Sequence, residues 1–194
     1  GYYQTVNKTT PVAGDVKYVD RNGDGVVDDN DRDIIGNPNP DFTYGFQTKV
    51  SWKSLSLSAS FNGVQGRDIL NVGNRYNNTP GTKSNNVTRK AFQNMWTDEN
   101  PSNLYPKSTF VVQNMVMDRY VEDGSYLRCS DITLSYVLPA KWTNKIGIKN
   151  TSVYASVKNA FVITDYSGYD PEVNSFAFDG LRPGVDMNSY PTPR

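Results

Sequence analysis

The chain shows an alternation of apolar and polar residues with a period of two. In residues 43–52 apolar side chains occupy every second position, and residues 55–62 repeat this pattern after only Lys53 and Ser54. Because successive side chains of a strand point to opposite faces, these runs predict a tight antiparallel hairpin over residues 42–64. Its predicted apolar face comprises Tyr44, Phe46, Thr48, Val50, Trp52, Leu55, Leu57, Ala59 and Phe61.

A second strand pair is predicted within residues 119–162. The run "SYLRCSDITLSYVLP" places Ile132, Leu134, Tyr136 and Leu138 on one face, and Pro139 marks its end. After the connector 140–150, the run "TSVYASVKNAF" places Val153, Ala155 and Val157 on one face. The sequence therefore predicts an all-β fold of antiparallel strands.

Long irregular segments separate the predicted strands. Residues 1–41, 65–118 and 163–194 are rich in Asn, Gly, Pro and Thr, with one short helix expected around residues 88–96. Short connections alternate with long ones, which is typical of outer-membrane β-barrels, whose long loops face the outside. A tilted strand crosses a bilayer with about 9 to 11 residues, and the predicted strands approach this length. We expect a transmembrane β-barrel segment with long extracellular loops.

Composition excludes several other classes of function. The 20 basic and 20 acidic residues give no net charge, so we expect no nucleic-acid partner. With no His, the usual histidine bases and triads are excluded, and the single Cys129 has no base candidate nearby in sequence. Asp165, Asp170 and Glu172 resemble the paired acids of glycosidases, but surface loop charges explain them better. We expect a chain that is not an enzyme.

The segment "VDRNGDGVVDDNDRDIIG" (19–36) gathers six aspartates around two glycines. Asp20, Asn22, Asp24, Gly25 and Asp31 match positions 1, 3, 5, 6 and 12 of an EF-hand calcium loop. Position 12 carries Asp instead of the usual Glu. The spacing predicts a structural calcium site with six ligands: Asp20, Asn22, Asp24, the carbonyl of Val26, Asp28 through a water, and Asp31. The alternative is a solvated loop of Asx-turns that binds no metal.

Four loop aromatics are candidates for contact with a sugar or peptide. Aromatic faces stack on pyranose rings, and the predicted outer loops carry Trp96, Tyr105, Tyr166 and Tyr169. Packing within the loops, or against a partner protein, is the alternative for each of them. The sequence favours the packing role and leaves the substrate contacts undefined.

Five ordered segments resemble the C-terminal part of a SusC/RagA-type TonB-dependent outer-membrane transporter. They are "GDVKYVDRNGDGVVDDNDRDIIGNPNPDFTYGF" (14–46), "MWTDENPSNLYP" (95–106), "RYVEDGSYLRCSDITLSYVLP" (119–139), "VKNAFVITDYSGYDPEV" (157–173) and "YPTPR" (190–194). Any one segment is a weak signal, but five in order are specific. The resemblance covers nearly the whole sequence.

The resemblance implies a function that this segment shares with other parts of a larger protein. Such transporters are large barrels with a plug domain, which this chain lacks. They work with a SusD-like surface lipoprotein, take up glycan or peptide fragments, and receive energy through TonB. On this hypothesis residues 1–194 supply barrel strands and surface loops in a Gram-negative outer membrane.

One alternative from another class of protein remains open. A soluble, secreted β-domain stapled by calcium, such as an adhesin or a scaffold-docking module, would also explain the polar composition and the aspartate loop. In a soluble domain the apolar strand faces pack against a second sheet, whereas in a barrel they face lipid. The surroundings of Tyr44, Val50, Leu57 and Leu134 therefore separate the two hypotheses.

Overall fold

The computed structural model describes residues 2–3, 12–79, 86–108, 116–148, 150–176 and 179–187. The chain divides into two compact units, which we describe separately. The sheet unit comprises Pro40–Gly66, Gly124–Tyr166 and Thr192–Arg194. The loop unit comprises Gly1–Asn39, Arg67–Asp123 and Ser167–Pro191.

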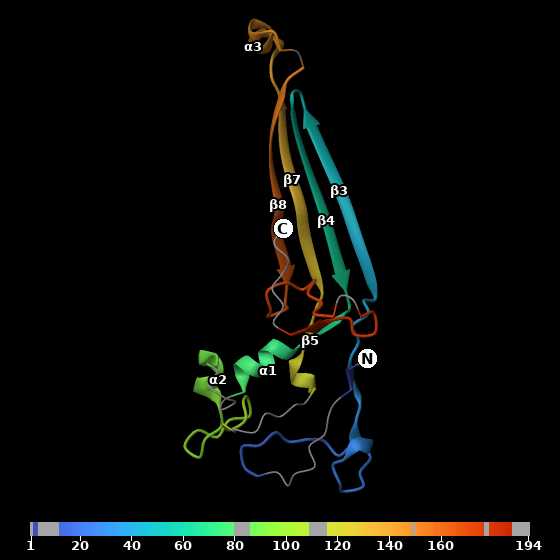
Figure 1. Cartoon of the computed structure of the whole chain (residues 1–194), viewed down its shortest axis with the longest axis vertical. Helices are drawn as coiled ribbons and strands as arrows, with labels where there is room; N and C mark the ends of the chain where they lie inside the picture. The colour runs from blue at the N-terminus through green and yellow to red at the C-terminus, as the bar shows by residue number, and fades with distance from the viewer. Residues whose placement is uncertain are drawn as a thin grey trace. The chain divides into compact units, whose positions relative to one another are not determined.

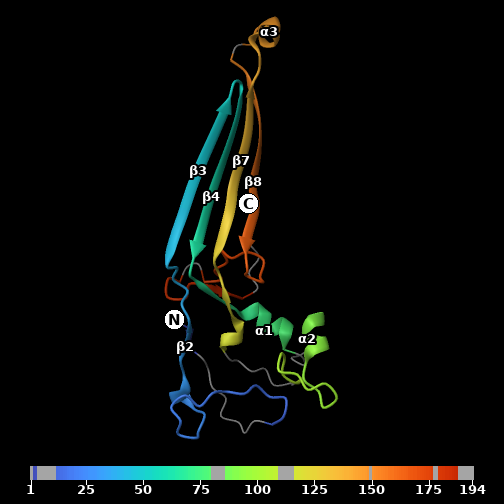
Figure 2. The same ribbon diagram turned by 180° about the vertical axis from the view of Figure 1, so that it is seen from behind.

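The sheet unit is one layer of four antiparallel strands, visible from both sides in Figures 1 and 2. The strands are β3 (Phe42–Trp52), β4 (Leu55–Gln65), β7 (Tyr126–Val137) and β8 (Ser152–Thr164), in the order β3-β4-β7-β8. All four predicted strands are confirmed. Their bounds differ at four ends: β4 continues to Gln65, Leu138 lies outside β7, β8 continues past residue 162, and residues 119–125 do not belong to the strand pair.

Cross-strand register places the apolar side chains of all four strands on one face. Val50 lies opposite Leu57, Leu57 opposite Leu134, and Leu134 opposite Ala155. Phe46 stacks on Phe61 with ring centroids 4.5 Å apart. The apolar face is therefore continuous across the sheet. Directly opposed side chains of this kind stabilise neighbouring strands against each other.

A β-bulge at Ser130 maintains this face where the sequence alternation changes phase. Ser60 pairs with Asp131 and the next residue, Phe61, pairs with Cys129, so Ser130 is the extra residue of β7. The Ser130 hydroxyl donates to the carbonyl of Ser60 at 3.1 Å. The bulge therefore brings Cys129 to the same face as Ile132, although three positions separate them in the sequence.

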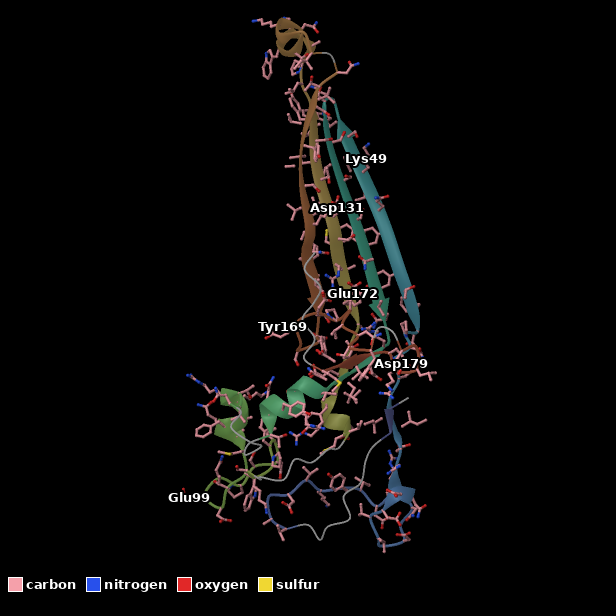
Figure 3. The ribbon with its side chains drawn as sticks, in the orientation of Figure 1. Lys49, Glu99, Asp131, Tyr169, Glu172 and Asp179 are labelled. Carbon is pink, nitrogen blue, oxygen red and sulfur yellow. The ribbon has the colours of Figure 1, made fainter. Side chains whose placement is uncertain are left out.

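The two faces of the sheet differ in chemistry and in cover. On the apolar face no described residue covers Val50, Trp52 or Ile163, which are 62%, 67% and 62% exposed. Side-chain hydrogen bonds cross the opposite face, from Gln47 to Ser60 at 2.9 Å and from Ser156 to Asp131 at 3.0 Å. Figure 3 shows Asp131 partway along β7. The sheet therefore has one apolar face and one polar face whose side chains are joined by hydrogen bonds.

Short connections join the strands at one end of the sheet. Lys53 and Ser54 form the β3–β4 turn, with Lys53 at φ 52°. The β7–β8 connection contains two short helices, α3 (Ala140–Thr143) and η3 (Asn144–Ile146), which the sequence analysis treated as a plain connector. Among the described residues, no helix is both long and apolar enough to cross a membrane.

The loop unit has more regular structure than the sequence predicted. Residues 65–118 were expected to form an irregular loop with one helix around residues 88–96. That helix is α2 (Arg89–Asn94), which begins after its N-cap Thr88 and ends two residues earlier than expected. The segment also contains β5 (Asp68–Asn71) and a second helix, α1 (Val72–Asn78). β5 pairs with β6 (Val121–Asp123) and, in parallel, with β9 (Val185–Asp186) from the C-terminal segment.

The rest of the loop unit comprises short elements around a small core. β1 (Tyr2–Tyr3) pairs with β2 (Ile34–Gly36), and two 3₁₀ helices, η1 (Asp29–Asp31) and η2 (Asp118–Tyr120), complete it. Leu70, Met117 and Tyr120 are buried together, with Val16 and Tyr18 packed against them. Burial raises the pKa of Tyr18 to about 12. The loop unit thus has an apolar core of its own, which the sequence analysis did not expect.

Replacing Gly63 by alanine should destabilise the sheet. The Tyr44 ring covers Gly63, and an added Cβ would collide with that ring and lie 2.6 Å from the Tyr126 carbonyl oxygen. We expect Gly63→Ala to cost about 1–3 kcal/mol of stability, as overpacking does elsewhere. Gly45→Ala is the matched control, since its Cβ would meet only the Phe61 carbonyl oxygen at 3.4 Å. Thermal unfolding of both variants checks the prediction, and equal midpoints would contradict it.

Candidate functional site

The loop unit contains a polar pocket of about 490 Å³. α1 supplies one side of the pocket, α2 and its N-cap another, and the segment after β8 a third. The residues that line it are Asn71, Gly73, Asn74, Asn77, Asn78, Thr88, Lys90, Tyr105, Ser167, Gly168, Tyr169 and Asp186. Eight of these twelve residues carry an amide or a hydroxyl group, which suits a ligand with hydrogen-bonding groups.

The Glu122 carboxylate of β6 holds three segments of the pocket wall together. Its Oε1 accepts hydrogen bonds from Asn71 Nδ2 at 3.0 Å and Asn74 Nδ2 at 2.9 Å. The hydroxyl of Ser167 donates to the same oxygen at 2.9 Å, and the Ser167 backbone amide donates to Oε2 at 2.9 Å. Because hydrogen bonds to a charged acceptor are stronger than neutral ones, Glu122 fixes the orientation of both asparagine amides.

From Asn74 the hydrogen bonds continue along the wall to α2. Asn78 Nδ2 donates to Asn74 Oδ1, and the Thr88 hydroxyl donates to Asn78 Oδ1 at 2.6 Å. Thr88 Oγ1 in turn accepts the Ala91 amide at 3.2 Å and so caps α2. A continuous series of hydrogen bonds therefore runs from β6 to the start of α2.

The structure brings two of the four aromatic candidates to this pocket. Tyr105 is half-buried and lines it, and so does Tyr169, whose side chain is 77% exposed (Figure 3). Trp96 packs instead on the backbone of Gly14, where an added Cβ would lie 2.5 Å from the indole. Tyr166 belongs to the sheet unit and is only 5% exposed, so it offers little ring surface to a ligand.

The aspartate loop folds as a series of side-chain-to-backbone turns. The two carboxylate oxygens of Asp20 accept the amides of Gly23 and Gly25 at 2.7 and 2.8 Å. Gly25 has φ +81°, which glycine adopts without strain. Asn22 Oδ1 accepts the Asp24 amide at 2.9 Å, and Asp24 Oδ1 accepts the Val26 amide at 2.8 Å. Three of the expected calcium ligands, Asp20, Asn22 and Asp24, therefore bind backbone amides of the loop itself.

Asp31 closes this loop from its far end. The carboxylate is buried and accepts the amides of Arg21 at 2.7 Å and Asp28 at 2.8 Å. The Asp28 amide, and then that of Arg21, lower the pKa of Asp31 below its ordinary 3.8. This stabilisation is present above pH 3.8 and is lost as the pH falls through the lower folded-state pKa.

Two of the expected calcium ligands also cap the short helix η1. Asp28 caps η1, with its side chain accepting the Asn30 amide at 2.7 Å, and Asp31 completes the capping box. Within the described part of the chain, no three His, Cys, Asp or Glu side chains are grouped so that they could hold a metal ion. Calcium binding by this loop therefore remains a prediction.

Sequence reasoning did not find the residues that organise the pocket. Glu122 lies 48 positions from Asn74 and 45 from Ser167, so no local pattern links them. The asparagine-rich run "NVGNRYNN" (71–78) indicated a loop, because Asn has low helix propensity. The signal available was the segment "RYVEDGSYLR" (119–128), which contains Glu122 and belongs to the quoted resemblance.

Comparison with known proteins shows what these units belong to. The chain is 34% identical over 191 residues to a TonB-dependent receptor of Formosa agariphila, covering 94% of this chain and 19% of that receptor. It is 34% identical over 181 residues to the TonB-dependent receptor SusC of Bacteroides thetaiotaomicron, covering 90% of this chain and 16% of SusC. No protein-family model matches the chain. The chain spans about a fifth of the length of these relatives.

Solved structures agree with the sequence relatives. The RagAB peptide importer in its closed-closed state matches 98% of this chain and 21% of its own, with a TM-score of 0.73 and 24% identity. Its open-open state matches 95% of this chain and 20% of its own, with a TM-score of 0.73 and 27% identity. The four-stranded sheet is thus a segment of a β-barrel transporter fold. The chain belongs, as one segment, to the TonB-dependent receptors that include SusC.

This membership confirms several predictions made from sequence. The all-β fold and the resemblance to the SusC type are both confirmed. TonB-dependent receptors are not enzymes, which agrees with the expectation for this chain. Asp170 and Glu172, considered as paired acids, instead form a local turn in which Asp170 Oδ1 accepts the Glu172 amide at 2.9 Å.

Removing the charge of Glu122 should loosen the pocket wall. In Glu122→Gln an amide group replaces one carboxylate oxygen and faces donors that need an acceptor, which we expect to cost about 2 kcal/mol. Hydrogen exchange should accelerate in residues 71–78 and 167–169. Glu99→Gln, at an exposed carboxylate of the same unit (Figure 3), is the control and should leave exchange unchanged. Unchanged exchange in Glu122→Gln would contradict the organising role of the carboxylate.

Proposed function

We propose that this chain is part of a TonB-dependent outer-membrane importer of glycan or peptide fragments. The sheet unit forms part of the barrel wall, with its apolar face toward lipid and its polar face toward the lumen. The loop unit lies on the cell surface, contacts cargo through the pocket beside Tyr105 and Tyr169, and meets a SusD-like lipoprotein. The rest of the barrel, the plug and the contact with TonB come from other parts of the transporter.

The uncovered apolar face of the sheet unit is the main observation that supports this proposal. Residues of all four strands contribute to it, and no second layer covers it among the described residues. Monomeric soluble proteins rarely expose a contiguous apolar surface of this extent. The strands contain 11, 11, 12 and 13 residues, enough to cross a bilayer at the usual tilt of barrel strands.

The strand edges point to the same conclusion. Within the described residues, neither β3 nor β8 has a further partner on its outer edge. Unpaired backbone groups in hydrocarbon cost several kcal/mol each, so a membrane-spanning sheet has to close into a barrel. The sheet therefore needs neighbouring strands on both sides, and this agrees with a chain that spans about a fifth of its relatives.

The relatives support the importer assignment but leave the cargo open. SusC is named as a TonB-dependent receptor, and RagAB is named as a peptide importer. A pocket lined by asparagines, serine and tyrosines suits either peptide backbone or sugar hydroxyls. The soluble alternative would require a second sheet over the apolar face, and the described residues of the sheet unit form only one sheet.

The lipid-facing assignment is testable with neighbouring residues of one strand. Lys49 and Val50 are adjacent in β3 and point to opposite faces (Figure 3 labels Lys49). In the full receptor carrying Cys129→Ser, a nitroxide label at Val50→Cys should collide more with oxygen than with a water-soluble nickel complex. A label at Lys49→Cys should show the reverse. A label at position 50 that is open to nickel, or shielded from both reagents, would contradict the proposal.

We also propose that the aspartate loop binds calcium as a structural ion. The spacing of the oxygen-bearing side chains of Asp20, Asn22, Asp24 and Asp31 supports this role. In binding the ion, these side chains would exchange some of their present hydrogen bonds for metal coordination. The ion would then hold the loop in place beside the small core of the loop unit.

Calcium removal tests this role in the full receptor. Added calcium should slow hydrogen exchange in residues 20–31, whereas chelation should accelerate it. Asp24→Asn should weaken the apparent calcium affinity by roughly ten-fold, because affinity depends on the number of charged ligands. Asp29→Asn is the control, since position 10 of such a loop carries no ligand. Identical exchange with calcium and with chelator would rule out the site.

A further inference from the structure

A smaller pocket of about 320 Å³ adjoins the polar pocket of the loop unit. The two share Asn74, Asn78, Lys90 and Tyr105 as lining residues. The smaller pocket is completed by Asn103, Leu104, Arg119 and Tyr120. Its charged lining residues are Lys90 and Arg119, and the described residues contribute no Asp or Glu to this lining.

Neighbouring groups hold the Arg119 guanidinium in position. One of its nitrogens, Nη2, donates to the carbonyl of Leu104 at 2.8 Å. Its Cζ lies 5.5 Å from the ring centroid of Tyr105 and 5.6 Å from that of Tyr120. A guanidinium has five N–H donors, and among the described residues only the Leu104 carbonyl accepts a hydrogen bond from this one. Because it is already oriented, little side-chain entropy is lost when it binds an anion.

Lys90 provides a second positive charge that is available to a ligand. It lies on α2 and is exposed, and the ammonium group has no hydrogen bond or ion pair to another described residue. The Glu122 carboxylate, which binds the shared residue Asn74, is already satisfied by Asn71, Asn74 and Ser167. The described lining of the smaller pocket therefore contributes no carboxylate that could neutralise the two cations, and Asp186 lines only the larger pocket.

We propose that the smaller pocket binds a carboxylate group of the cargo. Arg119 supplies a fork of N–H donors that matches the two oxygens of a carboxylate, and Lys90 supplies a point charge beside it. Tyr105 lines both this site and the larger, amide-lined pocket. The proposal rests on the proposed import function, because it assigns a chemical group to the imported molecule. That group is a peptide carboxylate or the carboxylate of an acidic sugar.

Calorimetry on the full receptor in detergent tests the site with two matched pairs of probes. One pair is a hexapeptide with a free C-terminal carboxylate and the same peptide as its C-terminal amide. The other is trigalacturonate and its methyl ester. We expect the charged member of one pair to bind more tightly than the neutral member, and the pair that shows this preference identifies the source of the carboxylate. The preference should weaken as salt is added.

Variants of Lys90 and Arg119 then test whether these two residues cause the tighter binding of the charged probe. Lys90→Gln and Arg119→Gln should each weaken binding of the charged probe by roughly ten-fold and leave the neutral probe nearly unchanged. Arg119→Lys keeps the charge and should retain part of the preference. Lys141→Gln, which removes a lysine of the sheet unit, is the control and should change neither probe.

Three results would overturn the proposal. They are equal affinity for both members of each pair, no binding of either charged probe, or a preference that survives in the Lys90→Gln/Arg119→Gln double variant. None of these results bears on the lipid exposure of Val50, so failure of this site and failure of the barrel assignment are distinguishable.

Discussion

The structure depends on one constraint, which is that the apolar face of a four-stranded sheet must be removed from water. Tyr44, Phe46, Leu57, Leu134 and Val157 lie on this face, and the described chain provides no layer to cover it. Burial of apolar surface is the main driving force of folding, so the sheet needs an apolar environment from outside. In the barrel that we propose, a lipid bilayer supplies this environment and the hydrogen-bonded polar face lines an aqueous lumen.

The loop unit is stabilised in a different way, because it has an apolar core of its own. Its core is small, and hydrogen bonds to carboxylates organise much of the remainder. Glu122 joins β5, β6 and the segment after β8, and Asp31 joins the two ends of the aspartate loop. Both carboxylates accept several donors at once, and such charge-assisted bonds hold irregular backbone in a defined shape. The hydrogen bonds of Glu122 in this way organise the wall of the pocket.

The sequence predicted the strands well because period-two alternation is a local signal. Every strand of the sheet was found, as were the turn at Lys53 and the short helix after Thr88. The bulge at Ser130 was not predicted, because only the partner strand shows which residue is extra. Glu122 was missed for a similar reason, since its partners are distant in sequence. Of the loop aromatics, Tyr105 and Tyr169 could be placed at one pocket only after α1 and α2 were known.

An experimental structure of the full receptor in a lipid nanodisc tests the central claim most directly. The measurement is the identity of what contacts Val50, Leu57 and Leu134 on the apolar face. The account predicts ordered lipid or acyl-chain density against these side chains, with water and polar groups against Gln47, Ser60 and Asp131. A second protein layer packed on Val50 and Leu57, with the serine-rich face open to bulk solvent, would contradict it.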